Sequence, residues 1–120
     1  MAFGITAIKE IINNSKETLH IVKKENPDND RLTIHSGHTS VHEIWIPWVG
    51  NQNEFDKKVL EITFEESNNK ICIWQSGNTV RYSKGNFSDG GFAVAPMQKT
   101  DGNRKLTITE TKVVVEEFNN

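Results

Sequence analysis

The chain has 120 residues, 35% of them hydrophobic and 25% charged, with a net charge of −2. This length and composition are typical of one folded domain with its own core, so we expect residues 1–120 to form a single domain. Because the chain carries no block of Lys or Arg, it is not expected to bind nucleic acid, which requires neutralised phosphates. No apolar run approaches the ~20 residues that a membrane-spanning helix needs.

Two further features bear on the compartment. Cys72 is the only cysteine, so no internal disulfide can form and nothing indicates an oxidising compartment. Residues 1–4 lack the basic and apolar regions with which a secretory signal peptide begins. We therefore expect a soluble cytoplasmic protein, or one that is exported without an N-terminal signal peptide.

Alternation of apolar and polar residues dominates the chain and predicts half-buried strands rather than helices. The first segment, 5–12, is less regular and also fits a short helix, but its neighbours favour a strand. In segment 59–65, Leu60, Ile62 and Phe64 share one face, and polar residues occupy the other. After the first, the segments with this pattern are 19–21, 32–34, 44–46, 59–65, 71–73, 80–82, 92–94 and 106–108.

Residues that favour turns separate these segments at the spacing expected of an all-β fold. Positions 68–69, 77–78 and 101–103 predict tight hairpins, since Asn and Gly tolerate the positive φ of such turns. Positions 26–29 and 50–53 predict longer polar loops. The pattern favours a single antiparallel β-sandwich of about 8–10 short strands, with a closed β-barrel as the alternative.

Tryptophans depart from the alternation at two strands. If Ile44 and Ile46 point into the core, then Trp45 points outward, and Trp48 follows at the end of that strand. An outward Trp exposes a large apolar area together with one polar N–H, which suits stacking on a sugar ring or a place at lipid headgroups. The alternative is that a loop or a second subunit covers these rings.

The strand predicted at 71–73 shows the same departure. If Ile71 and Ile73 point inward, Cys72 and Trp74 lie on the face that should be wet. The segment 74–83 adds Asn78, Arg81 and Tyr82, and this mix of aromatic and hydrogen-bonding side chains favours a shallow polar ligand. An ordinary hairpin is the alternative interpretation.

Three of the four histidines, His35, His38 and His42, lie in one short stretch. They converge on a metal if the chain turns at positions 36–37, and otherwise form an exposed strand edge whose charge varies near neutral pH. Other catalytic patterns are missing, because Cys72 has no motif around it and the chain has no nucleophile elbow or phosphate-binding glycine loop. We therefore expect neither an enzyme nor a bound cofactor.

One arrangement of residues resembles aegerolysins: Ile12, Asn14 and Lys16 onward, the segment 34–37 before an apolar strand, and Trp74 on a later strand. These are small acidic β-sandwich proteins that bind membrane lipids, so the resemblance implies a sandwich with a lipid ligand. The Cys-Gly-Arg and Trp-Asp-Cys-Pro-Trp elements of that family are absent here. No site residue is therefore carried over from it.

Together, these observations predict a non-enzymatic ligand-binding β-sandwich, lectin-like or specific for a lipid headgroup. One alternative is a structural or self-assembling protein in which the outward tryptophans form a homo-oligomer interface. A further alternative is a metal-dependent enzyme that uses His35, His38 and His42. The residues that we expect to contact a glycan or headgroup are Trp45, Trp48, Trp74, Asn78, Arg81 and Tyr82.

Overall fold

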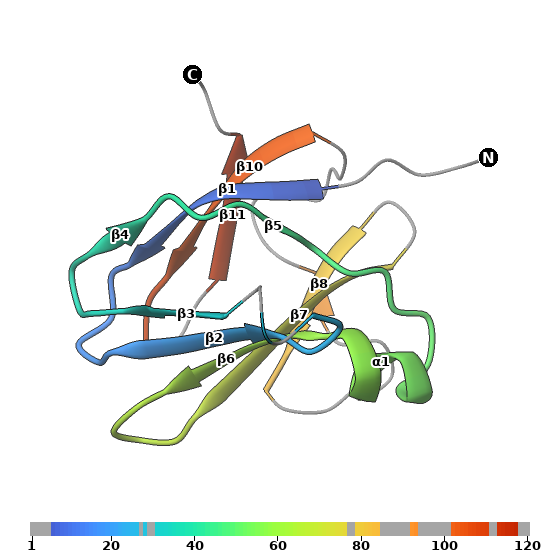
Figure 1. Cartoon of the computed structure of the whole chain (residues 1–120), viewed down its shortest axis with the longest axis horizontal. Coiled ribbons are helices and arrows are strands. Elements are labelled where there is room, and N and C mark those ends of the chain that lie inside the picture. Colours follow the sequence, from blue (N-terminus) through green and yellow to red (C-terminus); the bar gives the residue numbers. More distant parts are fainter. Residues whose placement is uncertain are drawn as a thin grey trace.

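The structure is a computed structural model that describes residues 6–26, 28, 31–76, 79–84, 92–93, 102–110 and 113–117. These residues form two β-sheets and one short helix, α1 (Gln52–Lys58) (Figure 1). The strands are β1 (Thr6–Asn13), β2 (Leu19–Lys23), β3 (Arg31–Ile34), β4 (Thr39–Ser40), β5 (Ile44–Trp45), β6 (Leu60–Phe64), β7 (Lys70–Ser76), β8 (Thr79–Ser83), β9 (Phe92–Ala93), β10 (Gly102–Ile108) and β11 (Val113–Glu117).

Sheet A has the strand order β11-β10-β1-β4, with β5 also paired to β1, and sheet B has the order β3-β2-β6-β7-β8-β9. The two sheets face each other as separate layers (Figure 1), and over the described residues they do not close into a barrel. Among the pairs of described strands, β1 and β10 run parallel and the others are antiparallel. The predicted all-β sandwich is therefore confirmed.

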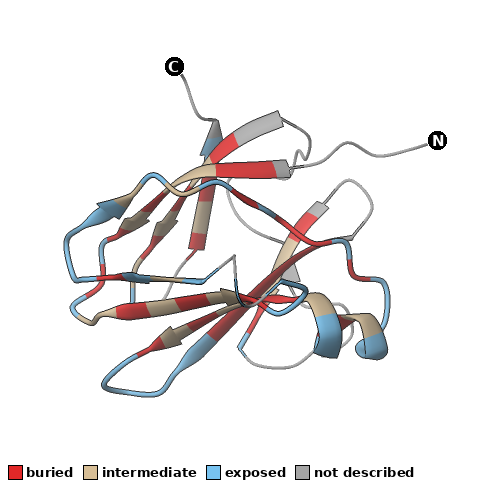
Figure 2. Ribbon diagram, in the orientation of Figure 1, coloured by how far each residue is buried: buried red, intermediate tan, exposed pale blue. Residues whose placement is uncertain are grey.

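The core lies between the sheets, and buried positions alternate along strands such as β2 and β6 (Figure 2). In β6, Leu60, Ile62 and Phe64 are buried while the residues between them are half-buried. In β2, Leu19 and Ile21 pair with this strand and are also buried. Burial of each such side chain stabilises the folded chain by about 1.5–3 kcal/mol, so the alternating apolar residues are the main source of the fold's stability.

The irregular first segment is a strand, as predicted, and it contains a β-bulge. The register of β1 against β10 shifts between Ile8 and Glu10. In a regular strand, residues three positions apart point to opposite faces. The extra residue of the bulge lets both Ile8 and Ile11 face the core. The bulge therefore accounts for the helix-like spacing of apolar residues in this segment.

Asn13, at the end of β1, connects the two sheets and is completely buried. Its side-chain amide donates to the backbone oxygens of Glu17 at 2.8 Å and of Ile34, in β3, at 2.9 Å. Its Oδ1 accepts from the backbone N–H of Ser15 at 2.9 Å and from the Ser15 hydroxyl at 2.6 Å. Both protons and both acceptor positions of the amide are thus used.

The predicted hairpins have mixed outcomes. Asn68 takes the expected positive φ, of 60°, but β6 and β7 are joined by the five-residue loop 65–69 rather than by a tight turn. Positions 77–78 lie outside the described residues, although Ser76 and Thr79 on either side of them pair. The hairpin predicted at 101–103 is wrong, because Gly102 and Asn103 belong to β10 and pair with β1.

The polar loop predicted at 50–53 is also wrong, because the chain begins α1 there. The side chain of Asn51 caps the helix by accepting from the backbone N–H of Glu54 at 2.9 Å. The Glu54 carboxylate in turn accepts from the backbone N–H of Gly50 at 2.9 Å. This reciprocal capping pattern, Asn-x-x-Glu, was the signal in the sequence. No helix in the described residues has the length and apolar content for crossing a membrane.

Candidate functional site

The segment 44–49 crosses from sheet A to sheet B and is held at both ends. In sheet A, β5 pairs with β1, with Ile44 opposite Ile8. Beyond β5, the backbone N–H of Gln75, in β7, donates to Pro47 O at 2.7 Å, and Val49 N–H donates to Gln75 O at 3.0 Å. Backbone bonds to both sheets therefore hold this segment where it passes from sheet A to sheet B.

The crossing segment exposes both of its tryptophans and buries its other side chains. Ile46 and Val49 are buried, whereas Trp45 is 48% exposed and Trp48 is 46% exposed. The outward direction predicted for Trp45 is confirmed. Two half-exposed indoles thus stand on a short stretch of backbone that has little freedom to move, a geometry that holds both aromatic faces toward solvent.

A polar contact anchors the Trp45 ring. Its Nε1–H donates to Glu43 Oε2 at 3.0 Å, and the Lys9 ammonium forms an ion pair with the same carboxylate. The hydrogen bond from Lys9, followed by the one from Trp45, holds the pKa of the Glu43 carboxyl below its usual range. The indole N–H is therefore occupied, while much of the ring stays accessible.

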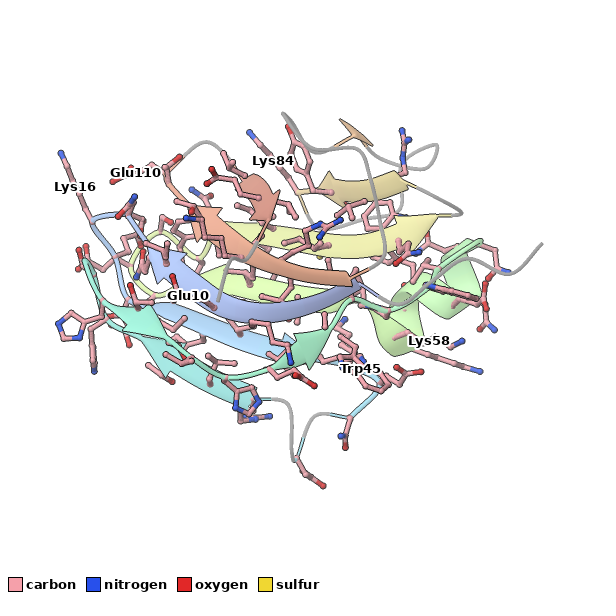
Figure 3. The ribbon with its side chains drawn as sticks, turned by 90° about the horizontal axis from the view of Figure 1, so that it is seen from above. Glu10, Lys16, Trp45, Lys58, Lys84 and Glu110 are labelled. Atoms are coloured by element: carbon pink, nitrogen blue, oxygen red, sulfur yellow. The ribbon has the colours of Figure 1, made fainter. Side chains whose placement is uncertain are left out.

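Two adjoining hollows surround these residues, and we call them together the tryptophan groove. One, of about 320 Å³, is lined by Trp45, Trp48 and the residues between them, with Lys23, Glu25 and Lys58. The other, of about 420 Å³, shares Trp45, Lys23 and Glu25 with the first and adds Glu43 and Asn26. Figure 3 shows Trp45 and Lys58 on the same side of the molecule.

The charges of the tryptophan groove are balanced and largely paired. Lys23 Nζ lies 3.4 Å from Glu25 Oε1, and Lys58 Nζ lies 3.5 Å from Glu54 Oε2 on the same helix. Glu43 is neutralised by Lys9, as described above. The groove therefore offers two aromatic faces, carboxylate acceptors and ammonium donors without a strong field of either sign.

Trp74 is not part of this surface. It faces away from the sandwich core, as the alternation predicted, but its exposure is 0% because α1 covers it. The Phe55 ring of α1 meets it edge to face, with centroids 5.3 Å apart and planes at 86°. Val59 and Cys72 complete this second apolar cluster. Trp74 is therefore not accessible to a ligand, contrary to the prediction, and Cys72 is a buried thiol.

The remaining predicted ligand residues do not join Trp45 and Trp48. Arg81 pairs with Trp74 across β7 and β8, and Tyr82 packs against the core between the sheets. Neither residue lines the tryptophan groove. Asn78 lies outside the described residues. The groove residues that the sequence did not single out are Lys23, Glu25, Asn26, Glu43 and Lys58.

The histidine stretch does not form a metal centre. His35 and His38 approach each other with ring centroids 5.9 Å apart. His42, however, does not join them, since over the described part of the chain no three His, Cys, Asp or Glu side chains are placed to hold a metal ion. The exposed rings of His35 and His38 instead sit at the turn between β3 and β4, where Gly37 takes a φ of 76°.

The chain matches no family model, no curated protein and no solved structure. The loose resemblance to aegerolysins thus gains no support from these comparisons.

Proposed function

We propose that the chain is a non-enzymatic, lectin-like module that binds an uncharged glycan in the tryptophan groove. The anchored and half-exposed Trp45, with Trp48 three positions on, is the observation that carries this proposal. The apolar faces of sugar rings stack on such indoles, whose bodies are apolar. Carboxylates and amides beside the rings, here Glu25 and Asn26, accept hydrogen bonds from sugar hydroxyls.

The charge pattern of the groove supports a neutral glycan over an anionic lipid surface. Attraction to an anionic bilayer depends on several basic side chains gathered near the membrane. Here the ammonium groups of Lys23 and Lys58 each lie within 3.5 Å of a carboxylate oxygen. A zwitterionic headgroup such as phosphocholine has no such requirement, so it is the competing ligand that the experiment must test.

The test is a glycan array probed with the full chain, followed by titration of the best glycan and of phosphatidylcholine vesicles while Trp fluorescence is recorded. We expect a glycan to quench the fluorescence and Trp48→Ala to weaken its binding about 10-fold, as buried aromatic contacts do. Lys57→Ala, an exposed position of α1 outside the groove, is the matched control.

Other results would point elsewhere. Saturable binding to phosphatidylcholine vesicles without any glycan response would replace the glycan with a lipid headgroup. A stable oligomer in light scattering that Trp48→Ala dissociates would favour the interface interpretation. Val41, which is 77% exposed and lies shortly before the segment 44–49, would add apolar area to such an interface. Either outcome refutes glycan binding at this groove.

A further inference from the structure

A second pocket lies at one end of the sandwich, away from the tryptophan groove. It forms where β6, β8 and β10 end and where β7 and β11 begin, so both sheets contribute to it. Its volume is about 150 Å³. Phe64 and Ile71 of sheet B and Val113 of sheet A give it a floor of buried apolar side chains, and Tyr82 also lines it. We call it the end pocket.

The rim of the end pocket is polar and mostly cationic. Two lysines, Lys70 and Lys84, and one carboxylate, Glu110, line it. Glu110 Oε1 accepts from the backbone N–H of Lys16 at 2.8 Å, which draws part of its charge away from the pocket. Figure 3 shows Glu110 and Lys84 on the opposite side of the molecule from Trp45 and Lys58.

The two lysines differ in their partners. Lys70 Nζ lies 3.7 Å from Glu61 Oε2, a carboxylate that also pairs with Lys24 at 3.4 Å. For Lys84, no carboxylate of the described residues lies within ion-pair range. Among the described residues of this rim, its ammonium is therefore the positive charge that a ligand can neutralise without displacing an ion pair.

We propose that the end pocket binds a small amphiphilic monocarboxylate, with its apolar body in the pocket and its carboxylate on Lys84. A pocket of about 150 Å³ is large enough for a body the size of a benzene ring, and the buried side chains of Phe64, Ile71 and Val113 provide the apolar contacts for it. An ion pair between a carboxylate and an ammonium is a charge-assisted contact and is stronger than a neutral hydrogen bond, so the charge gives the preference for an acid. The pocket does not involve Trp45 or Trp48, so this proposal stands apart from glycan binding.

The experiment titrates the full chain with benzoate and with benzyl alcohol, an uncharged analogue of similar size, while methyl NMR signals of Ile71 and Val113 are followed. We expect benzoate to shift these signals with a dissociation constant on the order of 1 mM. Benzyl alcohol should bind about 10-fold more weakly, because it lacks the charge.

Two variants of the rim should change benzoate affinity in opposite directions. Lys84→Gln should weaken benzoate binding about 10-fold and leave benzyl alcohol unchanged, whereas Glu110→Gln should strengthen benzoate binding severalfold by removing the rim carboxylate. Lys57→Gln and Glu116→Gln, exposed positions outside the pocket, are the matched controls. Equal affinity for acid and alcohol, indifference to Lys84→Gln, or shifts that appear only around the tryptophan groove would overturn the proposal.

Discussion

The indole of Trp45 is tied to Glu43, whose Oε2 accepts the Nε1–H at 3.0 Å while Lys9 holds the same carboxylate from the neighbouring strand. Such a tether restricts the rotation of an otherwise exposed ring. A ligand that stacks on it then meets a surface with little side-chain freedom left to lose on binding. Pre-organisation of this kind is what separates a binding platform from an incidental exposed tryptophan.

The first prediction concerns this tether. In Glu43→Ala, Trp45 loses its hydrogen bond and samples several rotamers, so glycan affinity should fall about 3- to 10-fold, in line with the ordering of one large side chain. The melting temperature at neutral pH should fall only slightly, because the ion pair and the hydrogen bond of Glu43 both lie at the surface and contribute little stability. Isothermal titration and thermal unfolding measure the two effects.

Glu66→Ala, an exposed position on the 65–69 loop, is the control for Glu43→Ala. A Glu43→Ala variant with unchanged glycan affinity would show that the tether plays no part in recognition, even if Trp48→Ala still weakens binding.

The second prediction separates the buried Trp74 from the half-exposed Trp48. Trp74 is buried against Phe55 of α1, so Trp74→Ala leaves a cavity and should reduce the free energy of unfolding by about 3–5 kcal/mol. Trp48→Ala, at a half-exposed position, should change it by no more than about 0.5–1 kcal/mol. Urea denaturation followed by circular dichroism provides both values. Equal losses in the two variants would contradict the division into core and surface rings.

The alternation of residues such as Leu60, Ile62 and Phe64 was sufficient to predict the strands and the sandwich, because one buried face imposes a period of two. It also predicted that Trp45 points outward. The same rule placed Trp74 on the outer face but did not reveal that α1 covers this face, since periodicity within a strand says nothing about what packs above it. The capping residues Asn51 and Glu54 held that information.

Contacts between residues far apart in the chain could not be predicted from the sequence. Lys23 and Lys58 approach Trp45 and Trp48 only because 44–49 crosses between the sheets, and no local pattern encodes that crossing. In the sequence, Asn13 is simply a turn-favouring residue next to Asn14. Its burial depends on where β3 places a backbone carbonyl, which is a property of the assembled fold.

The third prediction follows from that buried amide. Asn13→Ala removes the donor to the buried backbone oxygen of Ile34 and one of two donors to the oxygen of Glu17, which also accepts from the Ser15 hydroxyl at 3.0 Å. A buried polar group that loses its partner costs about 1–3 kcal/mol, so we expect a total loss of about 2–4 kcal/mol. Asn14→Ala, at the exposed neighbouring position, should stay within about 0.5 kcal/mol of the unmodified chain in the same denaturation experiment.

The fourth prediction concerns acid stability. Glu17 Oε1 accepts the backbone N–H groups of Ser67 and Glu66, each at 2.7 Å, and these bonds, led by that of Ser67, hold the pKa of Glu17 below its usual range. Glu43 is shifted in the same direction by Lys9 and Trp45. Because both carboxyls bind protons less readily in the folded chain, their ionised forms stabilise it.

The lowered pKa values of Glu17 and Glu43 determine the pH range over which their stabilisation is lost. The stabilisation is fully present above the ordinary glutamate pKa of about 4.3, and it disappears as the pH falls through the lower pKa of the folded state. The melting temperature should thus be level from neutral pH to about pH 5 and drop below about pH 4. The double variant Glu17→Gln, Glu43→Gln cannot titrate at these positions, so its melting temperature should fall less steeply over that acid range. Parallel curves for the variant and the unmodified chain in a calorimetric pH series would show that these two carboxyls do not contribute.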